Sequence, residues 1–180
     1  MASSATIYNF EINLSDLTRG IYQQFSLQVA QHPSETLKYL LTRVMAYCLE
    51  YCEGLEFTKG LADADLPALW VRDLTGELTA WIEIGSPSAE RLHRASKKVP
   101  RVVIYSYRTI AHVLSQLGED HIHHSKEIML HAIAPHFLSD LEPLINKRNV
   151  IDFSVSEGEI YLNIGGMSLV GQIESRALDG

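Results

Sequence analysis

The sequence predicts a compact single domain of the α/β (α+β) class, spanning residues 1–180 and built on a mixed β-sheet. Three observations indicate this fold class. Segments near both ends of the chain alternate apolar and polar residues, which is typical of half-buried strands. A segment between them repeats apolar residues with the period of a helix. A strand, a helix and a near-continuous apolar strand then follow one another, which favours a parallel pair of strands.

The first elements are predicted to be a hairpin and a helix. Apolar residues alternate over residues 8–14 and 25–29, and the polar segment between them is predicted to be the turn that joins two strands. Pro33 is predicted to open a helix, because apolar residues then recur at helical spacing, and Gly54 is predicted to end it.

A second hairpin, over residues 69–85, and a strand-helix-strand unit are predicted in the middle of the chain. The hairpin strands are expected over residues 66–73 and 77–84. Ser86 is predicted to cap the next helix, with Pro87 as its first residue. The apolar strand that follows is expected to run parallel to the second hairpin strand.

The remaining elements are predicted from shorter apolar patterns. They are a helix over residues 109–117, a histidine-rich loop, a strand near 128–134, a helix near 137–145, and a three-stranded meander over 150–155, 160–164 and 168–173.

Charge and composition exclude several classes of protein. The formal net charge of −7 disfavours general, charge-driven adhesion to nucleic acid. No apolar run approaches the length of a membrane span, and the N-terminus lacks the pattern of a secretion signal, so no membrane partner is expected. The two cysteines, Cys48 and Cys52, lie four residues apart and are predicted to be buried thiols on one helix face. A reducing, cytoplasmic location is therefore expected.

The order of elements from residue 33 onward resembles the restriction-endonuclease-like, PD-(D/E)XK core. In that core an acid at the start of a hairpin and an acid-any-lysine triplet on its second strand form the site. Two carboxylates hold Mg²⁺, which stabilises charge on the phosphate, and the lysine orients or activates the attacking water. Here Asp73 and Glu83 take the acidic positions, but the triplet is Glu83-Ile84-Gly85, so the lysine is missing.

Several blocks of residues resemble the bacterial YaeQ family over essentially the whole chain. They are Ala5-Thr6-Ile7-Tyr8, His32-Pro33-Ser34-Glu35-Thr36, Leu55-Glu56-Phe57-Thr58-Lys59-Gly60-Leu61, Asp65 with Pro67 and Trp70, and Trp81-Ile82-Glu83-Ile84-Gly85-Ser86-Pro87, followed by Arg91 and Lys97. The resemblance implies a mostly uncharacterised protein with a variant of the nuclease core and an altered motif.

The resemblance also implies a polar cluster, made of Glu56, Lys59, Asp65, Glu83, Arg91 and Lys97. The catalytic hypothesis assigns Mg²⁺ or Mn²⁺ to Glu83 together with an acid among Asp73, Asp65 and Glu56. Lys59 would replace the missing lysine, and Arg91, with Lys97, would bind phosphate of a nucleic acid.

Two other interpretations stay open. In the first, the chain is a non-catalytic module that binds nucleic acid or protein and has lost the catalytic lysine. In the second, Glu56, Lys59 and Arg91 form a partly buried ion network with no substrate. Similarly, the basic helix over residues 91–101 is either a solvated face or a nucleic-acid surface. The sequence leaves the oligomeric state open.

The histidines resemble a metal-binding tract but are predicted to be solvated or singly packed. They are His121, His123, His124, His131 and His136. Dinucleotide-binding, phosphate-loop and nucleophile-elbow motifs are all missing from the sequence, which gives no support to hydride transfer, nucleotide hydrolysis or serine hydrolysis.

Overall fold

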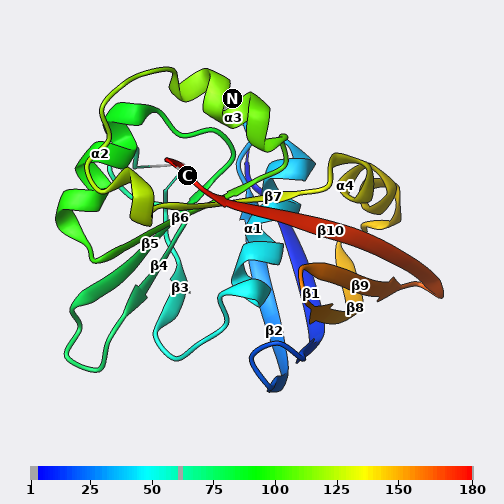
Figure 1. Cartoon of the computed structure of the whole chain (residues 1–180). Coiled ribbons are helices and arrows are strands. Elements are labelled where there is room, and N and C mark those ends of the chain that lie inside the picture. The colour runs from blue at the N-terminus through cyan, green and yellow to red at the C-terminus, as the bar shows by residue number, and fades with distance from the viewer. Residues whose placement is uncertain (1–3, 61–62, 180) are drawn as a thin grey trace.

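The structure is a computed structural model that describes residues 4–60 and 63–179. Its described strands form one ten-stranded sheet in the order β2-β1-β8-β9-β10-β7-β6-β5-β4-β3 (Figure 1). The strands are β1 (Thr6–Asp16), β2 (Ile21–Gln31), β3 (Leu55–Phe57), β4 (Leu69–Arg72), β5 (Leu78–Ile84), β6 (Arg101–Ser106), β7 (Met129–Ile133), β8 (Arg148–Ser156), β9 (Glu159–Ile164) and β10 (Met167–Ala177). The helices are α1 (Leu37–Leu49), α2 (Ala89–Lys98), α3 (Ile110–Leu117) and α4 (Pro135–Leu141), with short 3-10 turns at Ser125–Glu127 and Glu142–Leu144.

The sheet is mixed, as the sequence predicts. β1 pairs antiparallel with β2 and parallel with β8, and β8, β9 and β10 form the antiparallel meander. β10 then crosses to pair with β7, and β7, β6 and β5 are mutually parallel. β5, β4 and β3 complete the sheet as an antiparallel series. The α/β class, both predicted hairpins and the parallel pair β5–β6 are thereby confirmed.

Helices pack on both faces of the sheet, but over different strands. Side chains of α1 and α4 enter one core with the inward residues of β1, β2, β8 and β9. Side chains of α2 and α3 pack on the opposite face, over β5, β6 and β7. Figure 1 shows α2 near β5 and β6, α3 near β7, and α4 near β10. On the face of the sheet that carries α2, no described helix covers strands β2, β1, β8, β9 and β10.

Two helix starts differ from the prediction. Pro33 lies before α1, in a turn in which the Glu35 carboxylate accepts from the His32 backbone N–H at 2.9 Å. The cap is Thr36, whose hydroxyl accepts from the Tyr39 backbone N–H at 3.2 Å. Ser88, rather than Ser86, caps α2. The chain needs these extra residues because it turns at Gly85, which has a φ of 88°.

Other boundaries are shorter than predicted. α1 ends at Leu49 and not at Gly54, so Cys52 lies beyond the helix and is exposed, while Cys48 is buried. The prediction that both thiols are buried on one helix face is wrong for Cys52. The predicted strand over 66–73 is a strand only over β4. Within the described part of the chain, every helix is too short or too polar to cross a membrane.

Candidate functional site

Glu83 is the centre of the predicted site and is a buried carboxylate. It lies on the face of β5 that packs under α2, and only 4% of the residue is exposed. Its Oε1 atom accepts from the Trp81 indole Nε1 at 2.6 Å and from the Arg91 Nε at 2.6 Å. One oxygen of Glu83 therefore already has two N–H donors from the protein itself.

Arg91 is directed entirely at the protein. Its Nε contacts Glu83, and its two terminal nitrogens donate to the backbone carbonyls of Ala64 and Leu66. These carbonyls belong to the segment between β3 and β4, whereas Arg91 lies in the first turn of α2. The guanidinium thus fastens that segment to both α2 and β5. Each of the three guanidinium nitrogens donates to a protein acceptor, and these contacts use three of its five N–H groups.

Burial raises the pKa of the Glu83 carboxyl above its ordinary value. The hydrogen bond from Trp81 and the positive charge of Arg91 act in the opposite direction, but they do not overcome the desolvation. The arrangement is that of a carboxylate held inside the protein by one cation.

The space beside this pair is small. The hollow next to Glu83 and Arg91 has a volume of about 20 Å³, and it is lined by Ala64, Asp65, Trp81, Arg91, Arg94, Ala95 and Lys98. Ligand pockets typically measure roughly 300–1,000 Å³. A nucleotide does not fit into this hollow without a movement of α2 or of the segment before β4.

Asp73 lies far from Glu83, at the opposite end of β5. It is exposed in the β4–β5 turn, where its Oδ1 accepts from the Thr75 N–H at 2.8 Å, the Thr75 hydroxyl at 2.6 Å and the Glu77 N–H at 3.0 Å. The rise of a strand separates Glu83 from the Leu78 end of β5 by roughly 17 Å. Asp73 is a turn residue, and the structure does not bring it to Glu83.

Glu56 and Lys59 also lie apart from Glu83. Glu56 is exposed on β3, and its Oε2 accepts from the Trp70 indole Nε1 at 3.2 Å. Lys59 is exposed just after β3. Among the ion pairs of the described residues, none joins Lys59 to Glu83. The lysine that lines the hollow beside Glu83 is Lys98, not Lys59.

Asp65 and Lys97 belong to the solvent-exposed surroundings of the site. The Asp65 side chain is 77% exposed, and its Oδ1 lies 3.7 Å from Arg94 Nη1. Lys97 is exposed in the last turn of α2. Asp65 lines the hollow beside the Glu83–Arg91 pair, and Lys97 is not among the residues that line it.

The expected Mg²⁺ or Mn²⁺ site stays a prediction. Such an ion needs several oxygen ligands that converge on one point. The described residues contain no group of three or more His, Cys, Asp or Glu placed to hold a metal ion, so water or substrate oxygens would have to complete the coordination of an ion bound there.

The predicted histidines form two unrelated groups. His121 and His123 lie near His93 of α2, with ring centroids 6.1 and 6.2 Å from that ring. The His123 backbone N–H donates to His93 Nδ1 at 3.2 Å. His131 instead stacks on Tyr105 at 4.9 Å in the sheet.

A second buried carboxylate, Glu50, was missed by sequence reasoning. It accepts from Arg101 Nη1 at 2.6 Å, Arg101 Nη2 at 2.9 Å and the Tyr105 hydroxyl at 2.7 Å. The group lies on the α1 face of the sheet, opposite Glu83. Glu50 reads in the sequence as an ordinary polar residue at a helix end, so no local pattern could have revealed it.

A large surface of the sheet carries no helix, and we call it the open face. Several of its apolar side chains are well exposed, with Tyr22 at 64%, Val150 at 60% and Val170 at 54%. The open face comprises Ile7, Asn9, Glu11, Asn13 and Ser15 of β1, Tyr22, Gln24, Ser26 and Gln28 of β2, Arg148, Val150, Asp152 and Ser154 of β8, Tyr161 and Asn163 of β9, and Ser168 and Val170 of β10.

The open face is organised in rows of directly paired residues. One row crosses five strands in the order Tyr22, Ser15, Ser154, Tyr161 and Val170. Because the two serines are much shorter than the tyrosines, the surface is lower between the two aromatic rings. The row therefore combines apolar contact area with hydroxyl groups.

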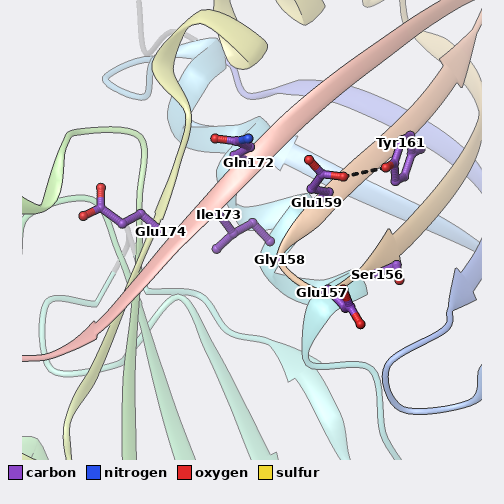
Figure 2. Close-up of a pocket in the computed structure, with 8 residues that line it drawn as sticks. All are labelled: Ser156, Glu157, Gly158, Glu159, Tyr161, Gln172, Ile173 and Glu174. Carbon is purple, nitrogen blue, oxygen red and sulfur yellow. Dashed lines mark hydrogen bonds between the residues drawn. The ribbon is translucent and has the colours of Figure 1, made fainter.

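Two hollows lie on the open face. One of about 540 Å³ lies over β2, β1 and β8, and Asn9, Gln28 and Arg148 are among its lining residues. The other, of about 760 Å³, lies where β10 leaves β9, and Figure 2 shows Glu159 hydrogen-bonded there to Tyr161. This second hollow is lined by Ser156, Glu157, Gly158, Glu159, Tyr161, Gln172, Ile173 and Glu174.

Comparisons with known proteins agree on one family. Residues 1–172 match the family described as "YaeQ protein". The chain is 36% identical over 111 residues to "Uncharacterized protein YaeQ" of Escherichia coli (strain K12), a match that covers 62% of this chain and 61% of that protein. It is 29% identical over 168 residues to the protein of the same name from Salmonella typhi, covering 91% of each. The chain thus spans about three fifths of the length of the Escherichia coli relative.

Two solved structures share the fold. The crystal structure of YaeQ protein from Pseudomonas syringae superposes with a TM-score of 0.85 at 30% identity, covering 95% of both chains. YaeQ protein from Xanthomonas axonopodis pv. citri gives a TM-score of 0.82 at 28% identity, covering 96% of this chain and 98% of that one.

Proposed function

The chain belongs to the YaeQ protein family, and within that family we propose that it is a non-catalytic module that binds a protein partner on the open face. The observation that carries this proposal is the contact set of Arg91. Its guanidinium contacts Glu83 and the Ala64 and Leu66 carbonyls, which supports a structural role for Arg91 and Glu83 over metal and phosphate binding.

A protein partner is favoured over nucleic acid by the distribution of charge. Acids outnumber bases on the open face and its larger hollow, where Glu11, Asp152, Glu157, Glu159 and Glu174 oppose Arg148. A phosphate backbone would be repelled by such a surface. On α2, Arg91 pairs with Glu83, and Arg94 lies within ion-pair distance of Asp65 and Glu90.

Exposed apolar side chains support the choice of surface. Large exposed hydrophobic residues gather on the open face, and those found there are Ile7, Tyr22, Val150, Tyr161 and Val170. Exposed aromatic and apolar side chains in polar surroundings are found at protein-interaction sites. We expect the partner to present apolar side chains and to favour contact with an acidic surface.

The catalytic alternative is tested by a cleavage assay. The purified chain is incubated with plasmid DNA, single-stranded DNA and RNA in the presence of Mg²⁺ or Mn²⁺, and its Glu83→Gln variant serves as the matched control. We expect no cleavage by the native chain beyond that seen with the variant. Cleavage that disappears in Glu83→Gln and with a chelator would establish an enzyme and overturn the proposal.

The binding surface is tested by site-specific photo-crosslinking in growing bacterial cells. A benzophenone amino acid is placed at Tyr161 or at Val150 of the open face. The control position is Leu74, which is 88% exposed but lies in the β4–β5 turn. We expect the same protease-sensitive adduct from both open-face positions and none from the control. An adduct that nuclease digests, or one equally strong from Leu74, would contradict the proposal.

A further inference from the structure

The two edges of the sheet differ in how well they are protected. The β3 edge is three residues long. The β2 edge is eleven residues long, pairs with β1 without a break in register, and reads IYQQFSLQVAQ. It carries no charged residue, no proline and no bulge, which are the usual devices that keep strand edges apart. In the described residues, β1 is the sole strand paired with β2.

The backbone hydrogen bonds of β1 show which backbone groups of β2 point outward. The Asn9 N–H donates to the Lys147 carbonyl, so odd-numbered residues of β1 face β8 and even-numbered ones face β2. Because the register pairs Phe10 with Leu27, odd-numbered residues of β2 bond to β1. Even-numbered residues of β2 therefore direct both N–H and C=O away from the sheet.

One end of this edge is already covered. Arg43 of α1 donates from Nη2 to the Ala30 carbonyl at 2.8 Å, and its Nη2 lies 3.0 Å from Glu35 Oε1. This contact also confirms that the Ala30 carbonyl points outward. The outward groups left open are those of Tyr22, Gln24, Ser26 and Gln28 in the middle of β2.

The open segment is self-complementary about Phe25. An antiparallel copy centred on that residue pairs Tyr22 with Gln28 of the second copy and Gln24 with Ser26, all by outward-facing groups. No like charges meet in this pairing, since β2 has no charged residue. Side chains of the same kind meet on each face, because even residues lie on the open face in both copies.

Aromatic side chains flank the same edge on its helix side. Phe25 stacks on Tyr51 at a centroid distance of 4.8 Å and packs against Tyr47 at 5.6 Å. All three are only half-buried. A second copy of the strand would place its own Phe25 against this cluster and remove apolar surface from water.

We propose that two copies of the chain associate through β2, as antiparallel strands related by a twofold axis at Phe25. The pairing continues the sheet from one copy into the other and keeps both open faces on the same side. This inference is independent of what the open face binds. It predicts a particle of twice the 20.2 kDa chain mass in solution.

Sedimentation of the full chain over a concentration series tests the association. We expect a concentration-dependent dimer for the native chain. The double variant Gln24→Lys with Ser26→Lys places lysines directly across from lysines of the second copy, and we expect it to sediment as a monomer. Val170→Lys, on the open face but away from the edge, should remain dimeric. A native chain that stays monomeric, or a double variant that still dimerises, overturns the proposal.

A folding defect in the lysine variant is controlled by a second variant. Ser26→Pro removes an outward N–H that β1 does not use, so the monomer should keep its fold and its melting temperature while the dimer weakens by roughly tenfold or more. Unchanged dimerisation of a folded Ser26→Pro chain counts against β2 as the interface.

Disulfide trapping tests the register. In a Cys52→Ser background, Phe25→Cys places two thiols across the axis at a separation that suits a disulfide, roughly 4.5 Å between Cα atoms. Mild oxidation should yield a covalent dimer. The control Tyr22→Cys should not, because its twin lies roughly 20 Å away along the strand. A covalent dimer from Tyr22→Cys and none from Phe25→Cys would disprove the axis.

Discussion

Arg91 and Glu83 join α2 to β5 through a contact of 2.6 Å between Nε and Oε1, in a place where only 23% of the Arg91 side chain is exposed. The same guanidinium also reaches the segment before β4. Arg91, which the sequence analysis assigns to phosphate binding, thus connects α2, β5 and the segment before β4.

Replacing Arg91 by Ala should destabilise the fold strongly. The change leaves Glu83 buried without its cation and releases the Ala64 and Leu66 carbonyls, so we expect a loss of about 3 kcal/mol in the free energy of unfolding. Urea denaturation measures it. Arg94→Ala is the control: that side chain is 54% exposed, and its removal should change little. Equal effects of the two variants would mean that the Arg91 contacts carry no stability.

Glu83 should make stability depend on pH. Because burial raises its pKa in the folded state, the folded chain holds that proton more tightly than the unfolded chain does. Its contribution is therefore fully present below the ordinary carboxyl pKa and is lost as pH rises through the folded value. We expect the unfolding free energy of the native chain to fall relative to Glu83→Gln across that window. A difference between the two that is flat with pH would contradict the raised pKa.

Asp73 should stabilise the β4–β5 turn and take no part in catalysis. Hydrogen bonds from Thr75, with those from Glu77 and Gly76, lower the pKa of its carboxyl. Asp73→Ala should lower the melting temperature, whereas Asp73→Asn should keep most of it, because the amide oxygen accepts the same bonds. The stabilisation should fade as pH falls below the ordinary carboxyl pKa. An alanine variant that melts like the native chain would exclude the turn role.

Gly171 should tolerate no side chain while Phe137 is present. A Cβ at this position would lie 2.5 Å from Phe137 Cγ. We expect Gly171→Ala to cost about 2 kcal/mol of unfolding free energy by overpacking. In the double variant with Phe137→Ala, the total loss should be smaller than the sum of the single losses. If urea denaturation shows that the two single losses of unfolding free energy are fully additive in the double variant, the two positions do not touch.

The two thiols should differ sharply in reactivity. Cys48 is fully buried, and burial raises the pKa of its thiol far above the ordinary value, whereas Cys52 is exposed. A thiol reagent should therefore modify one site per native chain and two per unfolded chain. Peptide mapping that finds Cys48 modified under native conditions would contradict the burial.

The fold was largely predictable because its signals are local. Alternation over β1 and the β8–β10 meander, and the helical spacing in α1, each lie within a single element. The YaeQ resemblance is also confirmed. Helix starts were less predictable, since Pro33 and Ser86 carry the right residue types but the caps are formed at Thr36 and Ser88.

The site was predictable in part and for a physical reason. Sequence placed Trp81 and Glu83 on one face of β5, which is correct. It could not show that α2 closes over that face, nor that Arg91 would find acceptors 25 and 27 residues away. Such contacts depend on how elements pack, and no spacing within one element encodes them. Asp73 and Glu83 were therefore grouped, although Asp73 lies in the β4–β5 turn and Glu83 lies near the far end of β5.

The parallel pairing of β1 with β8 constrains how the chain acquires its structure during translation. Asn13 and Asp152, which are hydrogen-bonded across that pair, are 139 positions apart. At a bacterial ribosome that interval takes on the order of 10 s to synthesise. Throughout it the β1 edge of the nascent β1–β2 hairpin lacks its partner strand β8. The N-terminal hairpin thus gains its parallel partner only when the last quarter of the protein has been synthesised. Chains that terminate before β8 should therefore be substrates for chaperones and proteases.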